Sequence, residues 1–139
     1  MAWRALDHTA DAGLVVEAAS WRELLEESAR AFGHYLSGGS EVGAHETWRP
    51  LEVRGADRVE TWVQHWRALY RLWTVEGFLA AHAELDVAEE DRVHGRVGCV
   101  SVGALDLARC VDVKAVTWHA ASVERRPDGT WTGTIVFDL

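Results

Sequence analysis

The segment Val59-Glu60-Thr61-Trp62-Val63-Gln64-His65-Trp66-Arg67-Ala68-Leu69-Tyr70-Arg71-Leu72-Trp73 decides the fold, because its apolar residues recur at helical spacing. They stand at i, i+3, i+4 and i+7 and so line one face of a helix: Val59, Trp62, Val63, Trp66, Leu69, Tyr70 and Trp73. Asp57, just before the segment, is the expected N-cap residue. A helix with such a face packs onto a sheet.

A second helix is predicted earlier in the chain. Ser20 followed by Glu23 matches the capping box, in which the two residues satisfy each other's free backbone N–H groups. Apolar residues then recur at helical spacing as far as Tyr35. The cluster Ser37-Gly38-Gly39-Ser40 ends the helix, because glycine readily takes up the left-handed conformation found after helix ends.

Most of the remaining chain alternates apolar and polar residues with the two-residue period of strands. We expect strands over residues 13–19, 47–54, 80–87, 93–102, 111–123 and 130–137. Pro50 indicates an edge strand, and Pro127-Asp128-Gly129 is a turn that joins the last two strands as a hairpin. The sequence therefore predicts an α+β fold, a two-layer sandwich of two helices on a largely antiparallel or mixed sheet of about six strands.

Composition limits the class of protein. A chain of 139 residues with 48% apolar and 26% charged residues fits one soluble globular domain over residues 1–139. No apolar run approaches the roughly 20 residues of a membrane-spanning helix, and the N-terminus lacks the apolar core of a signal peptide, so we expect no membrane contact and a cytoplasmic location. The net charge of −8 disfavours stable direct binding of nucleic acid.

Acidic residues stand near both ends of the chain, in Asp7-His8-Thr9-Ala10-Asp11-Ala12-Gly13 and in Val136-Phe137-Asp138-Leu139. If the first and last strands are neighbours, Asp11, Asp138 and the terminal carboxyl of Leu139 converge. Crowded carboxylates require a cation or a proton, and Ca²⁺ and Mg²⁺ prefer oxygen ligands. The same residues also fit a simpler interpretation, in which Asp7 and Asp11 bond backbone N–H groups of a turn and Asp138 is a solvated strand end.

The strand segment Lys114-Ala115-Val116-Thr117-Trp118-His119 carries two further candidates. Alternation places Lys114 on the face of Val116 and Trp118, and His119 on the opposite face. His119 fits either a metal ligand or a hydrogen-bonded structural residue, and Lys114 fits a counter-charge, a partner contact or a solvated lysine. The chain contains no G-x-S-x-G, P-loop, H-E-x-x-H or G-x-G-x-x-G motif, so no catalytic residue is nominated.

These three segments together resemble the archease family, from about residue 6 to the end of the chain. The resemblance implies a non-catalytic accessory protein of the RtcB-type tRNA-splicing RNA ligase, which joins 2′,3′-cyclic phosphate or 3′-phosphate ends to 5′-hydroxyl ends. It implies that the protein promotes guanylylation of the ligase's active-site histidine and supports multiple turnover in tRNA processing.

The resemblance also implies a divalent metal site, usually calcium, with magnesium or manganese as alternatives. Its ligands map onto Asp11, Asp138 and Leu139 of this sequence. The neighbouring candidates for a partner contact, or for support of the metal ligands, are Asp7, His8, Lys114 and His119.

The second helix departs from the family pattern. The family usually has a tryptophan-leucine-asparagine segment followed by leucines and a tyrosine, whereas this chain has Gln64 at the asparagine position and a longer spacing to Tyr70. The apolar face is kept, so we expect the fold to be kept.

Two other interpretations stay open from the residues alone. One is a small metal-dependent phosphoester hydrolase that uses Asp11 and Asp138 with His8 or His119 as general base. The other is a scaffold or chaperone-like module whose acidic residues are simply solvated.

Overall fold

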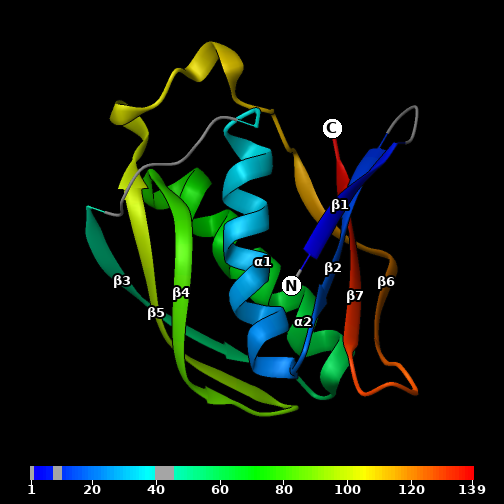
Figure 1. Ribbon diagram of the computed structural model, residues 1–139. Coiled ribbons are helices and arrows are strands. Elements are labelled where there is room, and N and C mark those ends of the chain that lie inside the picture. The colour runs from blue at the N-terminus through cyan, green and yellow to red at the C-terminus, as the bar shows by residue number, and fades with distance from the viewer. Residues whose placement is uncertain (1, 8–10, 40–45) are drawn as a thin grey trace.

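The computed structural model describes residues 2–7, 11–39 and 46–139, and for Asp7 the backbone alone. The described residues form two α-helices and seven strands, with short 3-10 turns at Val102–Ala104 and Leu107–Arg109 (Figure 1). In chain order these are β1 (Ala2–Asp7), β2 (Asp11–Ala18), α1 (Trp21–Leu36), β3 (Thr47–Arg54), α2 (Arg58–Arg71), β4 (Phe78–Ala88), β5 (Arg92–Ser101), β6 (Ala115–Arg125) and β7 (Trp131–Asp138).

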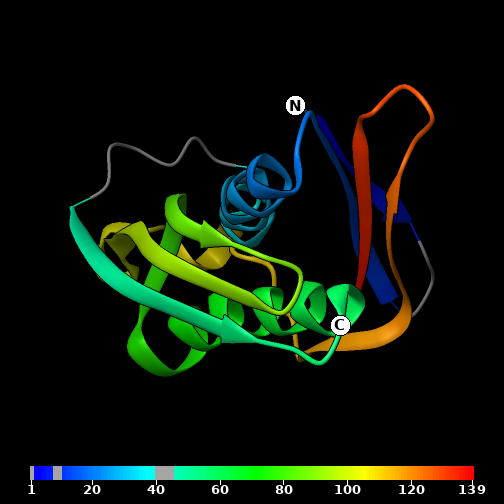
Figure 2. The same ribbon diagram turned by 90° about the horizontal axis from the view of Figure 1, so that it is seen from below.

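The strands form two sheets, one with the order β1-β2-β7-β6 and one with the order β3-β5-β4. Every strand pair is antiparallel. Helix α1 contacts β4 of the smaller sheet and β2 of the larger one, and α2 contacts β3 and β6. The two helices therefore lie between the sheets, as both views show (Figures 1 and 2).

The predicted α+β class, with two helices packed on antiparallel strands, is confirmed. The strands nevertheless divide between two sheets, and β1 was not predicted. Its residues pair only with β2, at the edge of the larger sheet, and carry no regular alternation of apolar and polar side chains. Periodicity therefore gives no signal for it, because an edge strand with little buried surface needs no alternation.

Both predicted helix starts are confirmed. The Ser20 side chain accepts a hydrogen bond from the Glu23 backbone N–H at 3.1 Å, and Asp57 accepts one from Glu60 at 2.8 Å. Such caps satisfy donors that have no partner within the helix. Helix α2 runs directly into a π-helical turn, Leu72–Glu76, which ends at Gly77 with φ of 77°.

An aromatic cluster joins the helices to the larger sheet. Trp62 and Trp66 of α2 are fully buried, and the ring centroid of Trp66 lies 5.9 Å from that of Phe137 on β7. Trp62 donates its indole N–H to the Thr134 carbonyl oxygen at 2.8 Å. Buried aromatic rings contribute large apolar areas, so this contact fixes α2 against β7 and with it the position of the chain's last strand.

The hairpin of β6 and β7 contains the predicted turn, with Gly129 at φ of 90°. Its pairing is regular at both ends but shifts between Thr117 and Ser122, where residues 118–121 form a bulge. Within the bulge Ala120 has φ of 54°, an unfavourable conformation for a residue with a Cβ.

No helix among the described residues is long and apolar enough to cross a bilayer.

Candidate functional site

Asp11 and Asp138 are direct register partners, at the start of β2 and the end of β7. The sequence prediction that the two acidic ends meet is therefore confirmed for these residues. Asp11 is the first residue of β2, whereas the strand predicted from the sequence begins at residue 13. Directly opposed residues of an antiparallel pair have Cβ atoms about 4.5–5.5 Å apart, so the two carboxylates share one small region.

The pair lies on the face of the larger sheet that is turned away from the helices. The next register pair, Ala12 and Phe137, is buried in the opposite direction, at 8% and 0% exposure. Side chains alternate along a strand, so Asp11 and Asp138 point outward. Asp11 is half-buried, Asp138 is exposed, and Leu139 is 43% exposed. An ion or a partner protein can therefore reach this end of the sheet.

Backbone hydrogen bonds hold Asp138 at this position from the other side. The Lys114 N–H donates to the Asp138 carbonyl oxygen at 2.8 Å, and Ala115 is the register partner of Asp138 on β6. The last strand is thus paired on both edges up to Asp138. Its carboxylate projects from a fixed backbone and not from a frayed end.

The electrostatics of the pair fit a hard cation. Like charges directly opposed on a sheet face are destabilising, by about 0.2–1 kcal/mol, and a divalent ion bound between them removes that repulsion. Carboxylate oxygens are also the preferred ligands of Ca²⁺ and Mg²⁺. Within the described part of the chain, however, no three His, Cys, Asp or Glu side chains come together, so the side-chain set is a pair of acids.

The other predicted site residues divide into two groups. His8 and the side chain of Asp7 lie outside the described residues, although the Asp7 backbone pairs with Ala12 at the end of β1. Lys114 lies just before β6 and is exposed, and no described carboxylate is within ion-pair distance of its ammonium group.

His119 lies in the 118–121 bulge, four residues along β6 from Ala115. The bulge breaks the regular alternation of faces that the sequence prediction assumed. Among the described residues, therefore, no imidazole stands beside the acidic pair as a general base for hydrolysis.

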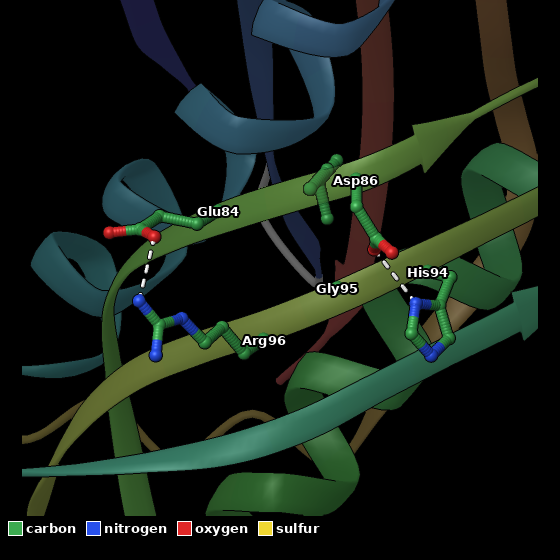
Figure 3. Close-up of a pocket in the computed structure, with 6 residues that line it drawn as sticks. Glu84, Asp86, His94, Gly95 and Arg96 are labelled. Atoms are coloured by element: carbon green, nitrogen blue, oxygen red, sulfur yellow. Dashed lines mark hydrogen bonds and ion pairs between the residues drawn. The ribbon is translucent and has the colours of Figure 1, made fainter.

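A hollow of about 360 Å³ lies elsewhere, on the smaller sheet, and Figure 3 shows it from close by. Its charged groups are paired with each other: Arg96 with Glu84 at 3.0 Å, and His94 with Asp86 at 2.7 Å. The hydrogen bond from His94 holds the pKa of Asp86 below its ordinary value. Because these side chains are already paired with one another, the hollow offers a bound ligand few free polar groups.

Sequence reasoning missed a second group of polar residues on α2 and β3. Arg54, Arg67 and Arg71 line a hollow of about 320 Å³ together with Gln64. The signal was present in the sequence, because residues 64, 67, 68 and 71 follow the same helical spacing as the apolar face, on the opposite side of the helix. It was hidden by the net charge of −8, which describes the whole chain and not one face.

Residues 3–139 match the Archease protein family (MTH1598/TM1083). Protein archease of Methanopyrus kandleri is 30% identical over 142 residues and that of Archaeoglobus fulgidus 33% identical over 141, each covering 100% of both chains.

Among solved structures, the solution structure of Methanobacterium thermoautotrophicum protein 1598 has a TM-score of 0.74 at 23% identity, covering 99% of this chain and 98% of that one. That likeness shows a shared fold. The family assignment rests on the family match over residues 3–139 and on the identity to the two archease proteins. The chain belongs to the archease family, whose members are accessory proteins of RNA processing.

Proposed function

We propose that this protein is a non-catalytic activator of an RtcB-type tRNA-splicing RNA ligase in the cytoplasm. In this role it promotes guanylylation of the ligase's active-site histidine and so supports multiple turnover. The observation that carries the proposal is the direct opposition of Asp11 and Asp138 at an exposed end of the larger sheet. An acidic pair that no described imidazole joins fits service to another protein's active site better than catalysis by this chain.

The ligands proposed for the divalent metal are Asp11, Asp138 and the carboxyl group of Leu139, with calcium as the first candidate and magnesium or manganese as alternatives. When bound, such an ion supplies positive charge that offsets the charge of a nucleotide's phosphates. The protein's own contribution is position. Pairing on both edges of β7 holds the Asp138 backbone, and β2 holds Asp11 opposite to it.

The surroundings of the pair would contact the ligase. Lys114 is exposed, and its backbone N–H bonds the Asp138 carbonyl oxygen, which places the residue next to the acidic pair. We include Asp7, His8 and His119 as further contact residues on the basis of the family resemblance. A lysine at this point would meet an acidic group or a phosphate of the partner, since it has no ion-pair partner among the described carboxylates.

The test compares RNA joining by the partner ligase under single-turnover and multiple-turnover conditions, with and without this protein. We expect stimulation mainly under multiple turnover, and its loss with Asp11→Asn or Asp138→Asn. Asp91→Asn is the matched control, because Asp91 is an exposed acid in the turn between β4 and β5. Full stimulation by both site variants, or equal loss with the control, would refute the proposal.

An assay of the isolated protein distinguishes this role from the hydrolase interpretation. We expect no turnover of generic phosphoester substrates in the presence of calcium, magnesium or manganese. Hydrolysis that disappears with Asp138→Asn would instead assign the acidic pair to an enzyme.

A further inference from the structure

The solvent-facing side of α2 carries a concentration of positive charge on an acidic protein. Three guanidinium groups, those of Arg54, Arg67 and Arg71, line the hollow between α2 and β3, and Glu52 is the one carboxylate among its lining residues. The chain as a whole has a net charge of −8. Such a local reversal of charge attracts an anion to this face, where the rest of the surface repels it.

The arginines are not consumed by ion pairs within the described structure. Arg54 reaches Glu52 only at 3.6 Å, and both side chains are more than half exposed. Such an exposed pair contributes little and is easily exchanged for another partner. Neither Arg67 nor Arg71 has a described carboxylate within ion-pair distance. Their charge is therefore available to a ligand.

Arg67 is held in place while part of its guanidinium stays free. Its Nε and Nη2 atoms both donate to the Val116 carbonyl oxygen on β6, at 3.3 Å each. No described atom accepts from Nη1. The side chain is half-buried and bonds across from α2 to β6, so its position is fixed while the Nη1 N–H groups have no described acceptor. A fixed guanidinium loses less conformational entropy on binding an oxyanion.

An exposed aromatic ring stands next to this charge. Trp118 on β6 is 45% exposed, and the guanidinium carbon of Arg67 lies 5.8 Å from its ring centroid. Arg67 therefore belongs both to the hollow and to the Trp118 surface. Helix α2 contacts both β3 and β6, and Figure 2 shows it between these strands. An exposed indole beside a cation is the pairing that recognises a base next to its phosphate.

We propose that this face binds a nucleotide unit, with a phosphate group held by Arg54, Arg67 and Arg71 and the adjoining base stacked on Trp118. Phosphate is favoured over a carboxylate because its several oxygens accept from more than one guanidinium fork at once. The ligand is either a free nucleotide or one unit of single-stranded RNA, since both present the same chemistry. The site lies on the helix side of the sheet edge, away from the outward-facing acidic pair, and does not depend on the metal.

The test measures binding of a short fluorescein-labelled single-stranded RNA by anisotropy at low salt, with GTP, pyrophosphate and an oligoglutamate peptide as competitors. We expect weak binding, on the order of 100 μM, that weakens with added salt. If GTP displaces the labelled RNA, the site accepts a nucleotide unit from either source. If the RNA binds and GTP does not displace it, the ligand is a unit within a strand. Competition by oligoglutamate alone would overturn the proposal in favour of an acidic protein segment.

Variants locate the site. Arg71→Glu and Arg54→Glu should each weaken RNA binding about tenfold or more, whereas Arg109→Glu, an exposed arginine on another part of the surface, changes net charge equally and should have little effect. Trp118→Ala should weaken binding about fivefold or more, and Trp118→Phe should restore most of it because a ring remains. Undetectable binding by the wild type, or equal losses with Arg109→Glu, would refute the site.

Discussion

Asp11 of β2 and Asp138 of β7 face each other directly across an antiparallel pair, with Asp138 held on its other side by the Lys114 backbone. Two acids in this relationship repel each other unless a cation or a proton lies between them. Substitution of one of these acids should therefore stabilise the metal-free protein but remove the stabilisation that a bound metal provides.

Without metal, Asp138→Asn should raise the free energy of unfolding, by up to about 1 kcal/mol, because it removes the repulsion. With calcium at about 100 times its dissociation constant, the wild type should gain about 2.7 kcal/mol and the variant should gain little. Urea unfolding in chelator and in calcium measures both effects. A variant that is less stable in chelator, or as responsive to calcium as the wild type, would contradict the proposed metal site.

The buried His65 side chain should make the protein less stable in acid. The residue is fully buried, its Nε2 lies 2.9 Å from the Leu25 carbonyl oxygen, and its Nδ1 has no partner among the described residues. Burial lowers the pKa of His65 to about 4, against 6.5 for the free side chain. The unfolded chain therefore binds the proton more readily than the folded protein.

Stability from this residue should be complete above about pH 6.5 and decline as the pH falls to about 4, by on the order of 3 kcal/mol in total. Chemical denaturation across this range measures the slope, and His65→Gln should flatten it because an amide does not titrate. An unchanged slope in the His65→Gln protein would show that another group controls it.

Gly133 packs so closely against the aromatic cluster that the site has no room for a larger side chain. A Cβ at this position would lie 2.5 Å from the Trp62 ring, which is itself fully buried. Gly133→Ala should therefore destabilise the protein by about 1–3 kcal/mol through overpacking. Gly103→Ala is the control, because its Cβ would meet only the Ser101 Oγ atom at 3.7 Å. Thermal unfolding of both variants should show a lowered midpoint for the first alone.

We expect Ala120→Gly to be an exception to the rule that glycine destabilises a strand. Its φ of 54° costs a residue with a Cβ roughly 1–2 kcal/mol, a cost that glycine largely avoids. Ala120→Gly should therefore be neutral or stabilising by up to about 1 kcal/mol. Ala83→Gly, in a buried part of β4, should be destabilising. Equal destabilisation by both changes would place the bulge in a different conformation.

Much of the fold could be predicted because the decisive signals are local. The caps at Ser20 and Asp57, the apolar face of α2 and the turn at Gly129 each depend on residues close together in the chain. The edge position of Pro50 is likewise confirmed, since β3 is an edge strand. Local chemistry of this kind leaves few alternatives to a helix, an edge strand or a hairpin.

What could not be predicted depends on long-range pairing. The division into two sheets is set by which strand pairs with which, and the sequence of β5 does not show that it lies between β3 and β4. The 118–121 bulge has no signature residue, because Ala120 adopts a conformation more typical of glycine. The charge of the α2 surface arises from β3 and α2 together, and Arg54 joins Arg67 only in the folded chain.

The central claim is that the acidic pair serves the active site of a partner ligase. The most direct measurement is the rate of transfer of labelled guanylate to the ligase's active-site histidine, with wild-type protein, with Asp138→Asn and with the Asp91→Asn control. The account predicts acceleration by the wild type and the control and none by Asp138→Asn. Equal rates in the presence and absence of wild-type protein, or full acceleration by Asp138→Asn, would contradict it.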